Sequence, residues 1–134
     1  MKTTLAVVLV TAGLLLVVRP AVAHHAFSAE FDTNKPVTLT GTVTKVEWTN
    51  PHAWFYVDVA DATGKVTNWA FELGGPNTLI REGWTRNSMK VGEIVTVEGS
   101  QAKDRSPIAN AQIITLKSTG QRLFAASSRG AKEP

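Results

Sequence analysis

Cysteine is absent from the 134-residue sequence. Without a thiol, the chain forms no disulfide, offers no thiolate to a metal ion, and has no cysteine through which a lipid could anchor it. Its stability must therefore come from an ordinary hydrophobic core. Long hydrophobic runs are also lacking, because the apolar segment Leu5–Val18 is shorter than the roughly 20 residues that cross a bilayer as a helix.

The sequence also lacks the short motifs of common enzymes. It has no G-x-S-x-G elbow, no glycine-rich phosphate loop and no H-E-x-x-H pair. Its carboxylates are dispersed, with no pair at a spacing typical of acid–base catalysis. We therefore predict a protein that is not an enzyme.

The first 23 residues have the pattern of a cleavable export signal. Lys2 is a positive start, Leu5–Val18 is the apolar centre, and Ala21-Val22-Ala23 is the small-x-small pattern that signal peptidase requires. We predict cleavage before His24, export to the periplasm, and no membrane span in the mature chain.

An excess of basic charge is also missing once residues 1–23 are removed. The formal net charge of +3 falls to +1, because Lys2 and Arg19 leave with the signal. A nearly balanced surface lacks the electrostatic attraction that nucleic-acid binding needs. We therefore expect no nucleic-acid partner.

Residues 37–124 carry the pattern of a small β-domain. Apolar residues alternate along a first strand that runs from Val37 to a turn at Asn50, and their parity switches near Thr44, which indicates a bulge. Four further strands are expected over 53–59, 65–73, 93–102 and 108–116, with a short helix after Pro76 and a short segment at 122–124.

This order of three strands, a short helix and two strands predicts a mainly β fold, the five-stranded OB-like barrel. Another small closed barrel or a β-sandwich are the alternatives. We expect residues 24–36 to form an extended N-terminal arm and residues 125–134 to form a disordered tail.

Several segments together resemble a family of small exported bacterial proteins that is classed as a domain of unknown function. They are HHAFSAEFD (24–32), GTVTKVEWTNPHAW (41–54), NWAFELG (68–74), GWTRNS (83–88) and VTVEG (95–99). The resemblance implies a periplasmic address and a β-barrel-like fold, and it supplies no activity or catalytic residues. At the level of pattern, the chain also resembles periplasmic bacterial OB-fold proteins, which supports the fold alone.

The histidines suggest a copper site. After cleavage, the α-amine and imidazole of His24 would chelate one ion, and a third nitrogen would come from His52 or from His25. Cu(II) prefers such tetragonal nitrogen donors, and Glu30 or Asp32 could add an axial oxygen. The opposing interpretation is that the two N-terminal histidines form a solvated end and that His52 only starts a strand.

A second hypothesis concerns a face for a ligand or partner. Trp48, Asn50, Trp54 and Tyr56 share one parity with His52 and would lie on one side if the backbone stayed extended through Pro51. Exposed aromatics on an OB barrel can stack a base or a sugar, although packing under the arm is the commoner role.

Arg81 and Arg86 lie near the predicted helix, where they form either a solvated surface or a patch for an anionic ligand or partner. The sequence thus predicts a non-catalytic periplasmic binding protein, with Cu(II) as its sharpest ligand. A metal-free module that binds a periplasmic protein or a small polar ligand is the alternative.

Overall fold

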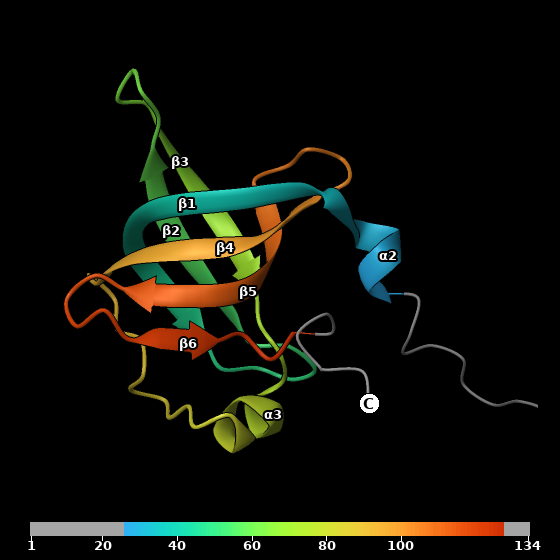
Figure 1. Ribbon diagram of the computed structural model, residues 1–134, viewed down its shortest axis with the longest axis vertical. Coiled ribbons are helices and arrows are strands. Elements are labelled where there is room, and N and C mark those ends of the chain that lie inside the picture. Colours follow the sequence, from blue (N-terminus) through green and yellow to red (C-terminus); the bar gives the residue numbers. More distant parts are fainter. Residues whose placement is uncertain (1–25, 128–134) are drawn as a thin grey trace, which may run out of the picture.

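Strand β1 (Phe31–Glu47) is the longest element, and it bends around the molecule in the computed structural model, which describes residues 26–127 (Figure 1). Its first part pairs with β4 (Ile94–Ala102) and its last part with β2 (Trp54–Ala60), both antiparallel. The register of β1 with β2 shifts between Val43 and Lys45. The bulge predicted near Thr44 is thereby confirmed.

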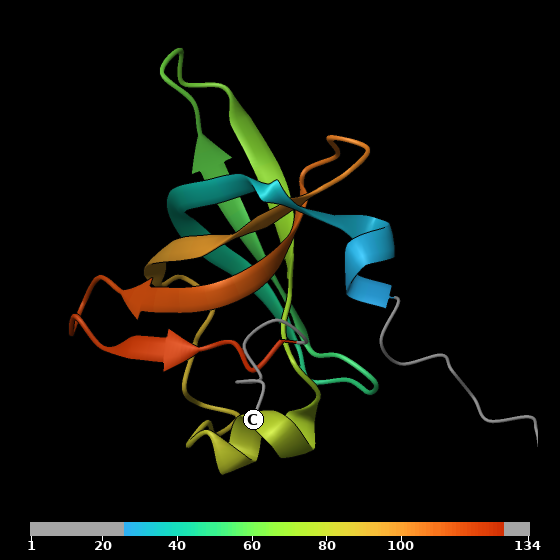
Figure 2. The same cartoon turned by 45° about the vertical axis from the view of Figure 1, so that its right-hand side comes forward.

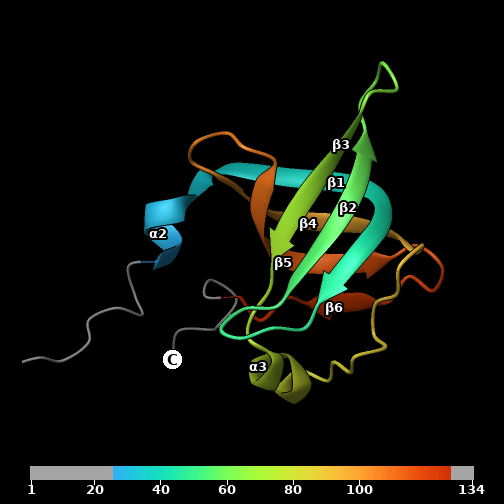
Figure 3. The same ribbon diagram turned by 180° about the vertical axis from the view of Figure 1, so that it is seen from behind.

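The remaining strands close β1, β2 and β4 into a barrel-like ring. β2 pairs with β3 (Val66–Glu72), β4 pairs with β5 (Ile108–Leu116), and β3 and β5 pair in parallel. β6 (Arg122–Phe124) continues the sheet beyond β5, outside the ring. Figure 3 shows the ring from behind, with β2 and β3 in front. This topology confirms the prediction of an OB-like arrangement of five strands.

The helix expected between the third and fourth strands is α3 (Pro76–Arg81). Proline stands at its start, where its missing N–H costs no hydrogen bond. α3 lies below the ring, near the end at which β6 and the β1–β2 turn are found (Figures 1 and 2). Within residues 26–127, no helix is long and apolar enough to cross a membrane.

The N-terminal segment differs from the extended arm expected over 24–36. Residues Ala26–Glu30 form a short helix, α2, and residues 31–36 belong to β1, with Phe31 opposite Ala102 of β4. Phe27 and Phe31 contact each other, with ring centroids 5.6 Å apart. Residues 1–23, for which we predict an export signal, and residues 24 and 25 lie outside the described residues.

The core contains the apolar residues that the strand pattern pointed inward. Phe55 and Phe71 are fully buried and stack with ring centroids 5.1 Å apart. Trp84, after α3, is 3% exposed, and its indole N–H donates to the Phe124 carbonyl at 2.8 Å. Trp69 is half-buried against Phe71.

The prediction of a disordered tail over 125–134 is wrong for residues 125–127. Ala125 and Ser127 are buried, and the Ala125 carbonyl accepts a hydrogen bond from Gly74 N–H at 2.8 Å. The N–H of Ala125 donates to Gln112 at 2.9 Å. These hydrogen bonds hold the segment after β6 against the residues that follow β3 and against β5. Residues 128–134 lie outside the described part of the chain.

Candidate functional site

The turn between β1 and β2 carries His52 to the end of β3. The hydroxyl of Thr49 donates to the His52 carbonyl at 2.9 Å, and the peptide bond between Asn50 and Pro51 is cis. Ala53 exchanges backbone hydrogen bonds with Leu73 and Gly74 at 2.9 and 3.1 Å. The position of the His52 backbone is therefore fixed by hydrogen bonds to the end of β3.

The imidazole of His52 is held in one orientation by two oxygen atoms. Its Nδ1 lies 3.0 Å from the Leu73 carbonyl oxygen and 3.6 Å from Glu72 Oε1. Because a carbonyl only accepts, Nδ1 must carry the hydrogen of this bond. In the neutral ring, the lone pair is then on Nε2, and the side chain is 36% exposed.

Glu72 is a buried carboxyl between two neighbouring strands. It pairs with Trp54 of β2 and with Asn110 of β5, and the residue is 7% exposed. Burial raises the pKa of Glu72, the charge of Glu30 raises it further, and the positive form of His52 opposes this. α2, which ends at Glu30, therefore lies close enough to influence the cluster electrostatically.

Asn110 completes this cluster from β5. Its Nδ2 donates a long hydrogen bond of 3.4 Å to Glu72 Oε1. Its Oδ1 is buried and has no hydrogen-bond partner within the described residues. Buried polar atoms are normally paired, so this oxygen is an exception in the interior beside Glu72.

The raised pKa of Glu72 predicts a pH-dependent stability. Between the ordinary value of 4.5 and the raised folded-state value, the folded chain holds a proton that the unfolded chain has lost, so stability falls as pH rises through this window. Glu72→Gln cannot ionise, and we expect its stability relative to the wild type to increase from about pH 4 to pH 8. Urea unfolding at a series of pH values measures this difference.

Glu82→Gln is the matched control, because Glu82 is an exposed carboxyl. This variant shows how the removal of a surface charge by itself changes the stability. A difference between Glu72→Gln and the wild type that stayed constant over this range would contradict the protonation of Glu72 in the folded state.

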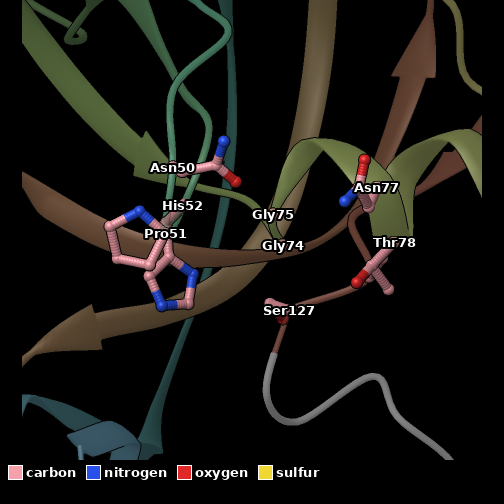
Figure 4. Close-up of a pocket in the computed structure, with 9 residues that line it drawn as sticks. Asn50, Pro51, His52, Gly74, Gly75, Asn77, Thr78 and Ser127 are labelled. Carbon is pink, nitrogen blue, oxygen red and sulfur yellow. The ribbon is translucent and has the colours of Figure 1, made fainter.

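A hollow of about 760 Å³ opens beside His52 (Figure 4). Its walls come from the β1–β2 turn, the β3–α3 connection, α3 and the segment after β6. The lining residues are Asn50, Pro51, His52, Gly74, Gly75, Asn77, Thr78, Ala126 and Ser127. The buried hydroxyl of Ser127 has no hydrogen-bond partner among residues 26–127. The hollow thus joins an imidazole to several neutral hydrogen-bonding groups.

A second hollow, of about 510 Å³, lies on the other side of Asn50 and Asn77, which line both. It is formed by aromatic, aliphatic and polar side chains together with one cation. Its lining residues are Trp48, Asn50, Pro76, Asn77, Ile80, Trp84, Thr85 and Arg86.

The ligand face predicted from side-chain alternation is interrupted at the β1–β2 turn. Residues 48–53 lie outside the strands, so the extended path through Pro51 is not formed. Trp48 and Asn50 line the second hollow, whereas Trp54 and Tyr56 lie on β2 and line neither hollow.

The remaining residues of the predicted ligand face also lie apart from one another. Tyr56 donates to Glu47 Oε2 at 3.0 Å. Arg86 joins Trp48 and Asn50 at the second hollow, and Arg81 of α3 lines neither hollow.

The predicted copper ligands are only partly within the described residues. His24 and His25 lie outside them. Glu30 ends α2, and Asp32 in β1 accepts a hydrogen bond from Asn34 N–H at 2.9 Å. Between residues 26 and 127, no three histidine or acidic side chains gather in a group that would hold a metal ion.

Glu72, Asn110 and Ser127 were missed by the sequence prediction. Alternation placed Phe71 and Leu73 in the core and Glu72 on the opposite face, where a carboxylate is usually exposed. The parallel pairing of β3 with β5 puts Asn110 beside it. No local sequence pattern predicts a contact between residues so far apart in the sequence.

Comparison with known protein families gives a match over most of the chain. A family model described as a family of unknown function (DUF6152) matches residues 12–109, which include His52, Glu72 and Arg86 but not Asn110 or Ser127. No curated protein matches the chain. Because the matched region covers more than half of the sequence, the chain belongs to this family of unknown function.

Proposed function

We propose that this chain is a non-catalytic, periplasmic binding protein that holds Cu(II) between its mature N-terminus and His52. The α-amine and imidazole of His24 supply two nitrogen ligands, and His52 Nε2 supplies the third. Cu(II) favours nitrogen donors in a planar arrangement and has the highest affinity among the common divalent metals. Such a protein carries, buffers or delivers copper.

The observation that carries this proposal is the hydrogen bond of His52. Metal-binding histidines usually donate from their second ring nitrogen to a carbonyl or carboxylate, which fixes the tautomer and the direction of the ring. The bond from Nδ1 to the Leu73 carbonyl at 3.0 Å, with Glu72 Oε1 at 3.6 Å, is of this kind. It leaves Nε2 as the ligand atom on a partly exposed ring.

The position of α2 also supports the proposal. The end at which the chain enters α2 lies toward the β1–β2 turn in all three views (Figures 1, 2 and 3). His24 precedes Ala26 by two residues, and consecutive Cα atoms are about 3.8 Å apart. Glu30 is a better axial ligand than Asp32, because its charge acts on the His52–Glu72 cluster and Asp32 is engaged by Asn34.

A second candidate function rests on the hollow beside His52. Its volume of about 760 Å³, the buried Ser127 hydroxyl and the side chains of Asn50, Asn77 and Thr78 suit a small neutral polar ligand without metal. The copper experiment must distinguish this metal-free binding from the binding of Cu(II).

The test is a Cu(II) titration of the chain that starts at His24, followed by electron paramagnetic resonance. We expect binding tighter than micromolar, a spectrum with nitrogen couplings, and weakening in acid because the α-amine must lose its proton. His52→Ala should weaken binding at least about tenfold and change the spectrum, since one nitrogen ligand is lost. His25→Ala is the matched control and should leave both unchanged.

Three outcomes decide against the proposal. An affinity weaker than micromolar removes copper as the ligand and favours the metal-free alternative. Binding that survives His52→Ala but is lost in His25→Ala or after one added residue before His24 assigns copper to the chain end alone. A spectrum without nitrogen couplings excludes the three-nitrogen site.

A further inference from the structure

The second hollow has an apolar wall that the fold leaves uncovered. Ile80 of α3 is 56% exposed, although burying an isoleucine side chain would stabilise the fold. The half-buried Trp48 lines the same hollow and packs against the core. An aromatic and an aliphatic side chain therefore present a surface suited to a flat apolar group.

Another part of the lining, Trp84 and Thr85, is held in place by hydrogen bonds. The indole N–H of Trp84 donates to the Phe124 carbonyl at 2.8 Å. In the loop after α3, Thr85 N–H donates to the Ser88 hydroxyl at 2.8 Å, and Met89 is 4% exposed in the core. The hollow is thus preformed, which lowers the entropy cost of binding a ligand.

A single unpaired cation lines this hollow. Arg86 is exposed, and no described residue forms an ion pair with it. No carboxylate is among the residues that line this hollow. The planar guanidinium presents paired donors that match the two oxygens of a carboxylate.

The remaining polar lining groups are neutral. Asn50, Asn77 and Thr85 offer amide and hydroxyl groups, which donate or accept hydrogen bonds but carry no charge to compete for Arg86. The volume of about 510 Å³ lies within the usual range for small-molecule sites. The walls therefore combine a surface for a flat apolar group with one site for an anionic group.

We propose that the second hollow binds a small aromatic carboxylate, with its ring against Trp48 and Ile80 and its carboxylate on Arg86. The hydrogen-bonding side chains of Asn50 and Asn77 orient the ligand between these two ends. Stacking on an indole and a charge-assisted hydrogen bond each add to the affinity beyond the area that is buried. This site is independent of copper, because His52 does not line it.

The test uses indole-3-acetate as the probe and its neutral amide as the matched ligand. Titration of the isotope-labelled chain, followed by nuclear magnetic resonance, should give a saturable shift of the Trp48 indole N–H, assigned with Trp48→Phe, with a Kd below about 1 mM. The amide should bind at least about tenfold more weakly, because it lacks the charge that pairs with Arg86.

Two variants separate the site from general attraction of anions. Arg86→Gln should weaken binding of the acid about tenfold and leave binding of the amide unchanged. Arg81→Gln replaces a neighbouring arginine outside the hollow and should change neither affinity by more than about twofold. Equal binding of acid and amide, equal effects of the two arginine variants, or no saturable shift up to roughly 10 mM would overturn the proposal. None of these outcomes bears on copper binding at His52.

Discussion

Phe71→Ala should lower the free energy of unfolding by about 3–5 kcal/mol, because it removes a fully buried ring and leaves a cavity. Phe71 stacks on Phe55 at 5.1 Å and contacts Trp69 at 6.2 Å between centroids, so its loss removes a ring contact from each of them. Small domains are stable by only about 5–15 kcal/mol. Calorimetry should therefore record a fall in Tm of more than about 10 °C.

Val66→Ala, on the same strand, is the control for this substitution. Val66 is 57% exposed, and surface substitutions usually change stability by less than about 0.5 kcal/mol. If Phe71→Ala lost less than about 1 kcal/mol, the packing of β2 against β3 in the core would be wrong. The effect should appear as a lower denaturant midpoint with an unchanged slope.

Gly74→Ala should destabilise the chain by about 3 kcal/mol or more. A Cβ at Gly74 would overlap the carbonyl oxygen of Ala126, which is backbone and cannot rotate away. The substitution must then separate β3 from the segment after β6, where Gly74 N–H donates to Ala125 at 2.8 Å. Because Gly74 lines the hollow beside His52, the site should be disturbed together with the fold.

Gly120→Ala distinguishes this overlap from the general cost of replacing glycine. Gly120 has a φ of +72°, and a Cβ there meets nothing within 4 Å. Its cost should stay near about 1–2 kcal/mol, from the left-handed backbone alone. Urea unfolding that ranked Gly120→Ala as the more damaging variant would show that β3 and the segment after β6 are not in close contact.

Phe71→Ala and Gly74→Ala both act where segments distant in the sequence meet. The candidate site lies in the same region. His52, Glu72 and Asn110 come from the β1–β2 turn, β3 and β5. Their arrangement depends on the parallel pairing that closes the ring. The relative positions of the imidazole and the buried carboxyl therefore depend on the closure of the barrel-like ring.

Much of the secondary structure was predictable from local pattern. The fifth strand, 108–116, and the short segment 122–124 have the predicted bounds, and Pro76 starts the helix as expected. The parity switch near Thr44 correctly located the bulge in β1. Alternation and turn residues are encoded within a few neighbouring positions, which is why they can be read without the fold.

The two ends of the described chain were predicted less well. Residues 26–30 are helical rather than extended, and Ala125 and Ser127 are buried rather than disordered. A short polar segment carries little intrinsic preference, so its conformation is decided by the surface on which it packs. For Ala125 this surface is the end of β3, which donates a hydrogen bond through Gly74.

The sequence by itself determined the absence of thiol chemistry and the order of strands and helix. Tertiary structure alone decided that Glu72 is buried beside His52 and Asn110, and that Trp48 and Arg86 share a hollow without Trp54 or Tyr56. The physical reason is that the first group depends on composition and local periodicity. The second depends on ring closure, which brings together side chains whose separation in sequence carries no signal.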